Sequence, residues 1–289
     1  MAGEMILRIC DVEHGACALL SHRENGVLGR LAMIDSGHAQ DWRPSTHIRY
    51  VLRRTQLDYL FITNADLDHM SDLNSLWEMG IHVASLTRNP HPTPAILRAI
   101  KLQSGSLGPD IERFLSIHET YNSPIPEPFD THMGRITFTS FFNSYPAFQD
   151  TNNLSLVIFF EYQGFKILFP GDLEAAGWLA LLTRDDFRAA LQGVDVLVAS
   201  HHGRENGYSE ELFKYCQPRA IIMSDKAIQH ETQKMAGTYR ARVVENFPDG
   251  VLVRTTMKRR HVLTTRRDGH IEITVSANGD FTIDTEYLG

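Results

Sequence analysis

Cysteines, long apolar runs and an excess of basic residues are all missing or scarce in this sequence, and each scarcity argues against a class of protein. The three cysteines are scattered and have no CxxC spacing, which favours buried thiols in a reducing compartment over a disulfide framework or a thiolate zinc site. No apolar run approaches the ~20 residues that cross a bilayer. Residues 1–6 lack a basic segment followed by an apolar one, so no secretory signal is evident. We therefore expect a cytoplasmic protein without membrane contact.

The charge is negative overall but unevenly spread. A net charge of −7 argues against a generally cationic protein that coats nucleic acid. Basic residues nevertheless crowd the C-terminal part of the chain. A solvated strand face is the commoner explanation of such a cluster, whereas a cluster beside an active site could hold a phosphate backbone. The candidate substrate-binding residues are Arg204, Arg240, Lys258, Arg259 and Arg260.

Two half-sheets with interleaved helices are predicted from the apolar periodicity. The predicted strands cover residues 5–12, 16–21, 30–35, 59–62, 83–86, 135–143, 155–162, 165–170, 194–199, 220–224, 251–256, 261–265, 270–275 and 281–285. The predicted helices cover residues 47–54, 70–79, 175–182, 187–191, 209–216 and 231–239. This order indicates a four-layer αββα sandwich or a pair of α/β lobes.

Residues 89–130 differ in character from the rest of the chain. Proline-dense segments enclose a helical stretch at residues 95–118. Borders of this kind are typical of an insertion or a lid over a scaffold rather than of a domain boundary. We therefore expect one domain over residues 1–289 with a lid-like insertion at 89–130.

Three loops carry Asp or His directly after an apolar run that reads as a buried strand. They are Thr63–His69, Gly171-Asp172 and Ser200–Gly203. Loops at strand ends are where a rigid sheet can direct several side chains at one point. Taken singly, each Asp is more often a helix cap or a turn residue, and each His a structural one. The coincidence of three such loops favours one metal centre assembled from distant parts of the chain.

The residue types in these loops indicate which ions could bind. Carboxylates and imidazoles together suit Zn²⁺, Mn²⁺ or Fe²⁺, and several carboxylates with fewer imidazoles favour the harder Mn²⁺. Asp172 follows a buried strand and a glycine, a position suited to bridging two ions ~3.5–4 Å apart. One or two divalent ions are therefore expected.

The order and spacing of the motifs resemble the metallo-β-lactamase fold superfamily, whose signature is HxHxDH after a strand, then GD, then a His at a strand end. More narrowly, the chain resembles the soluble metallo-hydrolase domain of the bacterial DNA-uptake channel ComEC and its free-standing relatives. The matching motifs are Asp11-Val12-Glu13-His14-Gly15, Ile34-Asp35-Ser36-Gly37, Asn64-x-Asp66-x-Asp68-His69, Asn152/Asn153 to Ser155, Gly171-Asp172, His201-His202-Gly203-Arg204 and His230.

The resemblance implies a firm ion site and a weaker one. Asp68, His69, Asp172 and a later His would hold the first ion, and Asp66 with Asp172 would hold the second. Asn64 replaces the first His of the family motif, and an amide oxygen is a poor ligand beside an imidazole. We therefore expect the second position to be weak or completed by substrate, with Mn²⁺ preferred over Zn²⁺ there.

The later histidines have alternative roles. His201 or His202 is the expected ligand, and the other could donate a proton or a hydrogen bond to a phosphoryl oxygen; His230 is a further candidate ligand. A metal-bound hydroxide would be the nucleophile, which makes Asp68, His202 and His230 the candidate catalytic residues. Asp35, Asn64 and Asn153 are expected to brace or orient the ligands. The remaining histidines, His14 among them, are expected at the surface or behind the ligands.

The function that these features favour is a metal-dependent hydrolase, a phosphodiesterase or nuclease. A lactonase, thioesterase or β-lactam hydrolase on the same fold is a rival, against which Asn64 and Arg204 count. A second rival is a catalytically impaired binding or sensor module, partnered with another protein in a stress or defence system. Asn64 keeps this second rival open.

Overall fold

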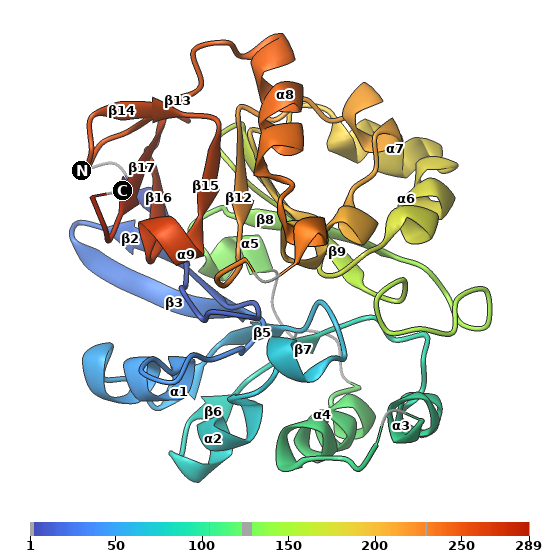
Figure 1. The fold of residues 1–289 in the computed structure, drawn as a ribbon. Coiled ribbons are helices and arrows are strands. Elements are labelled where there is room, and N and C mark those ends of the chain that lie inside the picture. The colour runs from blue at the N-terminus through green and yellow to red at the C-terminus, as the bar shows by residue number, and fades with distance from the viewer. Residues whose placement is uncertain (1–2, 104, 123–128, 229, 289) are drawn as a thin grey trace.

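The computed structural model describes residues 3–103, 105–122, 129–228 and 230–288. Within these residues, two large β-sheets pack face to face and helices cover both outer faces (Figure 1). The four-layer αββα sandwich that the sequence predicts is therefore confirmed, and the alternative of two separate lobes is not what the chain forms.

The larger sheet has nine strands among the described residues. Their order across the sheet is β14 (Lys258–Arg260), β13 (Val251–Val253), β17 (Phe281–Thr285), β16 (Ile271–Val275), β1 (Glu4–Ile9), β2 (Ala18–Glu24), β3 (Val27–Ile34), β5 (Tyr59–Phe61) and β7 (Leu86–Thr87). The smaller sheet has six strands among the described residues, in the order β15 (Val262–Thr264), β12 (Ala220–Met223), β11 (Val196–Val198), β10 (Phe165–Phe169), β9 (Leu156–Tyr162) and β8 (Thr137–Phe142). A small pair, β4 (Gln56–Leu57) and β6 (His82–Val83), forms a separate two-stranded sheet.

Alternation along the strands explains how the sheets pack. On β1, Met5, Leu7 and Ile9 are buried, while the residues between them are partly exposed. The buried side chains enter one apolar cluster with Ile158 and Phe160 of β9. Because alternate residues of a strand point to opposite faces, this pattern places one face of the nine-stranded sheet against the six-stranded sheet.

Helices form the two outer layers. On the nine-stranded sheet lie α1 (Pro44–Thr46), the π-helix η1 (His47–Val51), α2 (Leu73–Glu78), α3 (Pro94–Leu102) and α4 (Pro109–Thr120). On the six-stranded sheet lie α6 (Ala175–Leu182), α7 (Asp185–Leu191) and α8 (Ala236–Asn246). The short helices are α5 (Phe129–His132) and α9 (Thr265–Asp268), with 3₁₀ turns η2 (Leu67–His69), η3 (Ser200–Gly203), η4 (Glu205–Gly207), η5 (Glu211–Lys214) and η6 (Glu231–Gln233).

The proline-bordered segment 89–130 becomes part of a helical layer. It folds into α3 and α4 and then α5, with residues 104 and 123–128 lying outside the described part. Leu97 of α3 and Phe114 of α4 are buried in the same cluster as Leu76 of α2. The segment is therefore packed into the sandwich, and α3 runs along the border of the candidate site described below.

Five of the six helices predicted outside residues 89–130 begin or end elsewhere in the structure. The one at 47–54 ends at Val51 as the π-helix η1, and the one at 187–191 begins at Asp185 as α7. The prediction at 231–239 becomes the turn η6 followed by α8, the one at 209–216 is only the 3₁₀ turn η5, and the one at 70–79 shortens to α2. Before α2, the carbonyls of Asp68 and His69 accept hydrogen bonds from the Ala16 and Ser36 amides, at 3.2 and 2.8 Å. These tertiary bonds draw the chain out of a regular helix at the point where the motif lies.

The strand directions gather the motif loops. β10, β11, β12 and β15 run parallel to one another, as do β3, β5 and β7. The carboxyl ends of parallel strands meet at one edge of a sheet, which is where open α/β sheets bind ligands. The three motif loops follow β5, β10 and β11.

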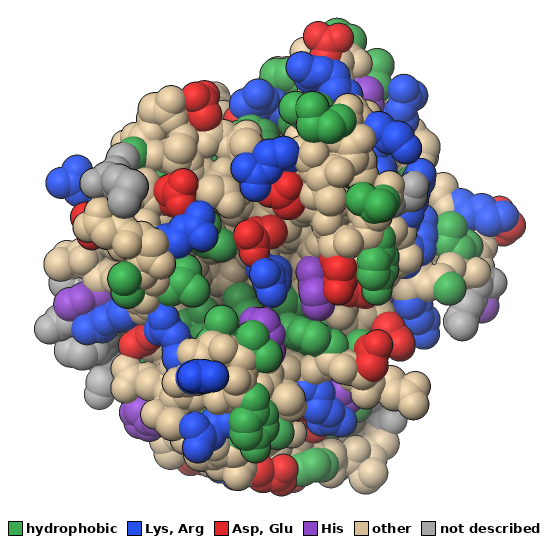
Figure 2. Space-filling model, turned by 90° about the vertical axis from the view of Figure 1, so that its left-hand side faces the viewer, with side chains coloured by type: hydrophobic (Ala, Val, Ile, Leu, Met, Phe, Trp, Pro, Cys, Tyr) green, Lys and Arg blue, Asp and Glu red, His purple; other side chains and the backbone are tan. Residues whose placement is uncertain are grey.

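The helices and the surface charges bear on whether the chain could cross a membrane or present a strongly basic face. Among the described residues, no helix combines the length and the apolar character that a membrane span requires. On the face drawn in Figure 2, the described Lys and Arg side chains are interspersed with Asp and Glu side chains.

Candidate metal centre

Four side chains from the three motif loops converge on one point. Asp68, His69, Asp172 and His202 each offer a ligand atom, and these atoms all lie within 4.8 Å of one another. His69 Nε2 is 3.0 Å from Asp172 Oδ1, and His202 Nε2 is 3.2 Å from Asp68 Oδ2. Asp68 is partly buried and the other three are buried. The group therefore joins two carboxylates and two imidazoles in a largely dry setting.

Hydrogen bonds behind the two imidazoles orient them. The Nδ1 of His69 lies 2.9 Å from Asp35 Oδ2, and the Nδ1 of His202 lies 2.9 Å from the Ser224 carbonyl oxygen. A carboxylate and a carbonyl can only accept, so each Nδ1 carries the proton. In the neutral ring this leaves the Nε2 lone pair directed at the centre, the arrangement found behind metal-binding histidines.

Asp35 is itself fixed in place. Its Oδ1 accepts a hydrogen bond from the Thr63 amide at 2.7 Å, and its Oδ2 accepts one from the Thr63 hydroxyl at 2.5 Å. Asp35 is 2% exposed and has a φ of 59°, a conformation that non-glycine residues rarely adopt. The structure thus places Asp35 behind His69, where the resemblance puts a bracing residue.

The backbone of the loop after β11 adopts left-handed conformations, which cost free energy. His201 and His202 have φ values of 50° and 57°, and such left-handed residues cost of order 1–3 kcal/mol each. The His201 amide donates to the Gly171 carbonyl at 3.1 Å, and the Ser200 hydroxyl donates to the Leu173 carbonyl at 2.5 Å. These bonds tie the loop after β11 to the loop after β10 and hold His202 toward the centre.

Glycine is required beside the Asp68 carbonyl. A Cβ added at Gly15 or at Gly37 would lie 2.4 Å from that oxygen, which is closer than nonbonded atoms approach. The loops that contain these glycines therefore pack directly on the backbone of the metal motif, and this explains the small residues in both.

The charges of the group stabilise one another. Burial alone would raise the pKa of Asp68 and Asp172, but the neighbouring His69 and His202 hold both pKa values well below the usual range. Burial opposes protonation of His69, yet the carboxylates of Asp172 and Asp35 overcome it and raise the pKa of His69 well above 6.5. The carboxylates thus stabilise positive charge at this point.

These residues fit a divalent cation. A cavity of about 30 Å³ is lined by His69, Asp172 and His202, and this volume is enough for a water-sized occupant. Within the described chain, the buried His69 Nε2 makes no hydrogen bond of regular geometry, although Asp172 Oδ1 lies 3.0 Å away. Carboxylate oxygens and imidazole nitrogens are ligands that Mn²⁺, Zn²⁺ and Fe²⁺ share, so the donor set supports a divalent metal and leaves its identity open.

The second predicted ion position is arranged differently. Asp66 lies outside the group of four: its Oδ1 accepts from the ammonium of Lys101, and both of its oxygens accept from the Thr151 hydroxyl, at 3.0 and 2.9 Å. Asn64 Nδ2 donates to Asn152 Oδ1 at 3.1 Å. The residues expected to complete a second ion are thus paired with protein groups.

Of the three candidate histidines, the structure brings His202 into the group. His201 Nε2 lies 3.9 Å from Asp172 Oδ2, and its Nδ1 lies 3.6 Å from Glu174 Oε1, which places it beside the centre. Burial lowers its pKa. His230 is exposed at the start of η6, and its amide donates to Gln233 Oε1 at 2.9 Å. His230 therefore lies outside the group, because its loop folds onto its own turn.

Asn153 also lies elsewhere than the resemblance suggests. Its Oδ1 accepts from the Gly177 amide at 2.9 Å, and its own amide donates to Asp150 at 2.7 Å. It thus supports the start of α6, while the adjacent Asn152 faces Asn64.

Two residues at the centre were missed from the sequence. His14 Nε2 lies 3.5 Å from Asp68 Oδ2, and its ring centroid lies 4.9 Å from that of His202. Arg204 Nη2 donates to His14 Nε2 at 3.3 Å. Burial, followed by the charge of His202, lowers the pKa of His14 to about 4. The two missed residues are His14 and Lys101. His14 occupies the Asp11–Gly15 motif, so its position in that motif was a usable signal, whereas nothing in the sequence around Lys101 indicated its contact with Asp66.

The basic cluster forms a pocket of its own. Its cavity of about 410 Å³ is lined by Arg240, Arg259, Arg260, His261, Arg266 and Arg267 together with small and apolar residues. Arg260 pairs with Asp268 at 3.2 Å, and Arg266 pairs with Asp225. Lys258 is exposed on β14 and does not line the pocket. None of the four metal-group residues lines it either.

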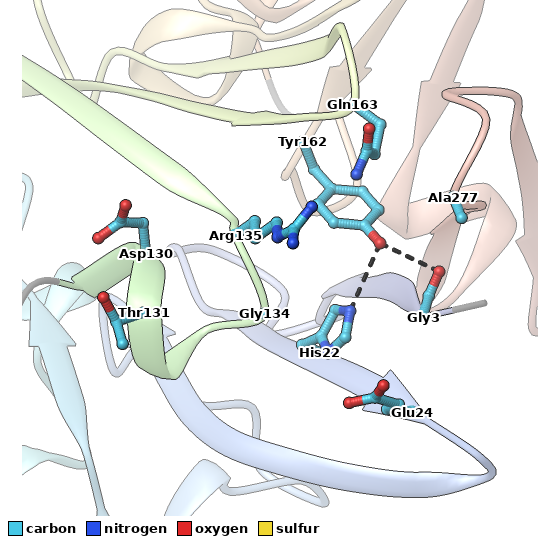
Figure 3. Close-up of a pocket in the computed structure, with 10 residues that line it drawn as sticks. All are labelled: Gly3, His22, Glu24, Asp130, Thr131, Gly134, Arg135, Tyr162, Gln163 and Ala277. Carbon is cyan, nitrogen blue, oxygen red and sulfur yellow. Dashed lines mark hydrogen bonds between the residues drawn. The ribbon is translucent and has the colours of Figure 1, made fainter. Parts of the chain in front are cut away.

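A larger cavity of about 680 Å³ lies away from the metal group (Figure 3). His22 and Tyr162 face each other in it, and the Tyr162 hydroxyl lies 3.0 Å from the Gly3 carbonyl oxygen and 3.4 Å from His22 Nε2. Burial raises the pKa of Tyr162. Volume alone favours this cavity, but its central polar groups bond to one another and none of the four converging ligands reaches it, so we assign the chemistry to the metal group.

No protein-family model matches the sequence, and no curated protein matches it. Several solved structures are similar in fold. A diphosphatase of the PhnP family is 12% identical over 96% of this chain and 100% of that one, with a TM-score of 0.44. The metallo-β-lactamase fold protein YhfI from Bacillus subtilis is 11% identical over 93% and 99%, with a TM-score of 0.46.

A third similar structure is CmlA, a diiron β-hydroxylase from Streptomyces venezuelae. It is 14% identical over 94% of this chain but only 54% of that protein, with a TM-score of 0.49. Likeness at this level carries no argument about activity. The candidate centre therefore depends on its own geometry.

Proposed function

We propose that the protein is a single-domain metal-dependent hydrolase of the metallo-β-lactamase fold, which cleaves phosphodiester bonds. The observation that carries the proposal is the convergence of Asp68, His69, Asp172 and His202 within 4.8 Å. Two oriented imidazoles and two carboxylates form a donor set that divalent metals share. The resemblance of the motifs to ComEC-like hydrolases supports the substrate class.

The four residues would hold one divalent ion. When bound, such an ion supplies a Lewis acid for a phosphoryl oxygen and a nucleophile at neutral pH. Asp35 and the Ser224 carbonyl hold the two imidazoles in the tautomer that binds metal. This chain's own contribution is therefore to hold the two Nε2 atoms aimed at one dry point, where a bound ion would displace the proton that Asp172 stabilises on His69.

Cationic and hydrogen-bonding groups beside the centre suit an anionic substrate. Arg204 and His14 contact each other at the edge of the group, 3.3 Å apart. Arginine presents several N–H donors in a planar fork that matches phosphate oxygens. We assign Arg204 the role of holding the substrate's phosphoryl group, with His14 as the residue that positions it. We assign His201, whose Nε2 lies 3.9 Å from Asp172 Oδ2, the role of hydrogen-bonding the leaving group.

The arginine pocket would extend the site for a longer substrate. Arg240 and Arg267 have no ion-pair partner among residues 3–103, 105–122, 129–228 and 230–288. Free guanidinium groups of this kind hold phosphates of a nucleic-acid strand without reading its sequence. A nuclease that contacts several phosphates is thus the more specific form of the proposal.

Replacement of one ligand tests the function. Purified protein with Mn²⁺ should cleave bis-p-nitrophenyl phosphate or single-stranded DNA, and Asp172→Ala should abolish both activities and lower the bound metal. Asp195→Ala is the matched control, because Asp195 lies at the opposite end of β11 and contacts Lys166 and Arg219. Undiminished turnover by the Asp172 variant contradicts the proposal.

The same preparation separates the two rival functions. Hydrolysis of lactone, thioester or β-lactam substrates without phosphodiester cleavage would assign the chain to acyl chemistry. Absence of stoichiometric metal after gentle purification would favour a binding or sensor module, which the pairing of Asp66 with Lys101 makes the stronger of the two rivals.

A further inference from the structure

A lysine from α3 lies on the carboxylate that would hold a second ion. The Lys101 ammonium contacts Asp66 Oδ1, and the Thr151 hydroxyl donates to both oxygens of the same carboxylate. The two charged side chains are only 16% and 27% exposed. Asp66 is therefore fully engaged by protein donors at a point close to the metal motif.

The residues around this pair offer amides in place of imidazoles. Asn64 Nδ2 lies 3.4 Å from Asp66 Oδ2 and donates to Asn152 Oδ1 at 3.1 Å. Asn152 in turn donates to Glu174 Oε1 at 3.0 Å. In the described part of the chain, the buried Asn64 Oδ1 accepts no hydrogen bond. One lone amide oxygen and one occupied carboxylate make a poor site for a divalent ion.

The fold holds the lysine there. Leu97 anchors α3 in the apolar cluster beneath the nine-stranded sheet, and Arg98 forms two hydrogen bonds to Glu112 of α4, both at 2.7 Å. Thr93 caps the helix through its hydroxyl, which accepts from the Ile96 amide at 3.4 Å. Lys101 thus reaches Asp66 from a helix that is fixed at its start, in its middle and against its neighbour.

We propose that the Lys101 ammonium takes the place of a second cation, so that the centre binds one metal ion, and that this ammonium also holds an anionic oxygen of the substrate. An ammonium has three N–H donors, and the contact with Asp66 uses one of them. Its positive charge repels a second divalent ion while supplying the attraction for a phosphoryl oxygen that such an ion would otherwise provide. This inference rests on the proposed phosphodiester function.

Metal stoichiometry tests the first half of the inference. Metal-free protein is titrated with Mn²⁺ and with Zn²⁺ by calorimetry, and bound metal is measured by mass spectrometry. The wild type is expected to bind one ion per chain. The double variant Lys101→Met with Asn64→His, which removes the ammonium and restores an imidazole, is expected to bind two.

Binding of inorganic phosphate tests the second half. In the Mn²⁺-loaded protein, Lys101→Met is expected to weaken phosphate binding by about ten- to a hundredfold, since one charge-assisted hydrogen bond is lost. Its affinity for the first Mn²⁺ is expected to stay unchanged. Arg98→Met is the matched control: it removes a positive charge from the same helix, where the partner is Glu112, and should leave both metal and phosphate binding as in the wild type.

The outcomes distinguish this inference from the proposed function. Two ions bound by the wild type, or phosphate bound equally by wild type and Lys101→Met, would overturn the inference while leaving hydrolysis intact. One ion with phosphate binding that depends on Lys101, but without phosphodiester cleavage, would support the inference and overturn the function. A wild type that binds no ion would overturn both.

Discussion

Replacing the carboxylate behind His69 should weaken metal binding and lower the stability of the fold. In Asp35→Asn, one acceptor oxygen becomes an NH₂ group. Asp35 accepts from the Thr63 amide, the Thr63 hydroxyl and His69 Nδ1, and an amide has only one oxygen for these three donors. Either His69 loses its partner or its ring takes the other tautomer, in which the proton sits on Nε2 and blocks the ligand atom.

The size of the effect follows from these contacts. Loss of the partner behind a ligand histidine typically costs 10- to 100-fold in metal affinity, which corresponds to about 1.4–2.7 kcal/mol at about 1.36 kcal/mol per tenfold change. Breaking a buried pair of charged groups also costs about 3–5 kcal/mol of stability. The variant should therefore unfold at lower urea and bind metal more weakly, and both changes should be measurable.

Calorimetric titration of the metal-free variant with Mn²⁺, together with urea unfolding, provides the assay. Asp58→Asn is the control, because Asp58 is a buried carboxylate that accepts from the Leu31 amide at 2.9 Å and from Gln56 at 2.6 Å and is not in the metal group. It should lose stability and keep its metal affinity. A folded Asp35→Asn protein that binds Mn²⁺ as tightly as the wild type would refute the assigned role of Asp35.

Three further predictions concern pH, backbone packing and the basic pocket. In the metal-free protein, the raised pKa of His69 means that its contribution to stability is complete below about pH 6.5 and is lost as the pH rises through the folded-state pKa. Because an ion must displace the proton on His69, the affinity for Mn²⁺ should rise over the same pH range. A calorimetric Mn²⁺ affinity that does not change with pH would contradict this. Gly37→Ala should lower metal affinity at least tenfold, since its Cβ would meet the Asp68 carbonyl at 2.4 Å, whereas Gly237→Ala on α8, with nothing within 4 Å, should leave it unchanged. The double variant Arg240→Ala with Arg259→Ala should weaken binding of single-stranded DNA and reduce its salt dependence by about one unit of slope per lost phosphate contact, with hydrolysis of a small phosphodiester as the activity that stays constant.

Local patterns were sufficient for the elements whose boundaries depend on their own residues. The helix at Ala175–Leu182 and the strand at Phe281–Thr285 were predicted with the bounds that the structure has. In both, the apolar pattern lies within the segment, and polar residues or glycine lie directly beside it in the sequence. The succession of strands and motif loops along the chain followed from these patterns, and with it the fold class; the order of the strands across each sheet did not.

Details of the centre depended on contacts between distant residues. The choice of His202 over His201 follows from left-handed backbone at both positions and from the Ser224 carbonyl in the loop after β12. Neither has a local sequence signal. The engagement of Asp66 follows from Lys101, a residue 35 positions away on a helix whose amphipathic pattern gives no hint of a contact with the motif. His230 resembles a ligand only by its order in the chain.

The ligand set is divided between the two halves of the molecule. Asp68 and His69 follow a strand of the nine-stranded sheet, whereas Asp172 and His202 follow strands of the six-stranded one. The complete set of four ligands therefore exists only when the two sheets are packed against each other. An ion bound there would cross-link the two sheets, so that removal of the ion by a chelator should speed proteolysis of both halves together.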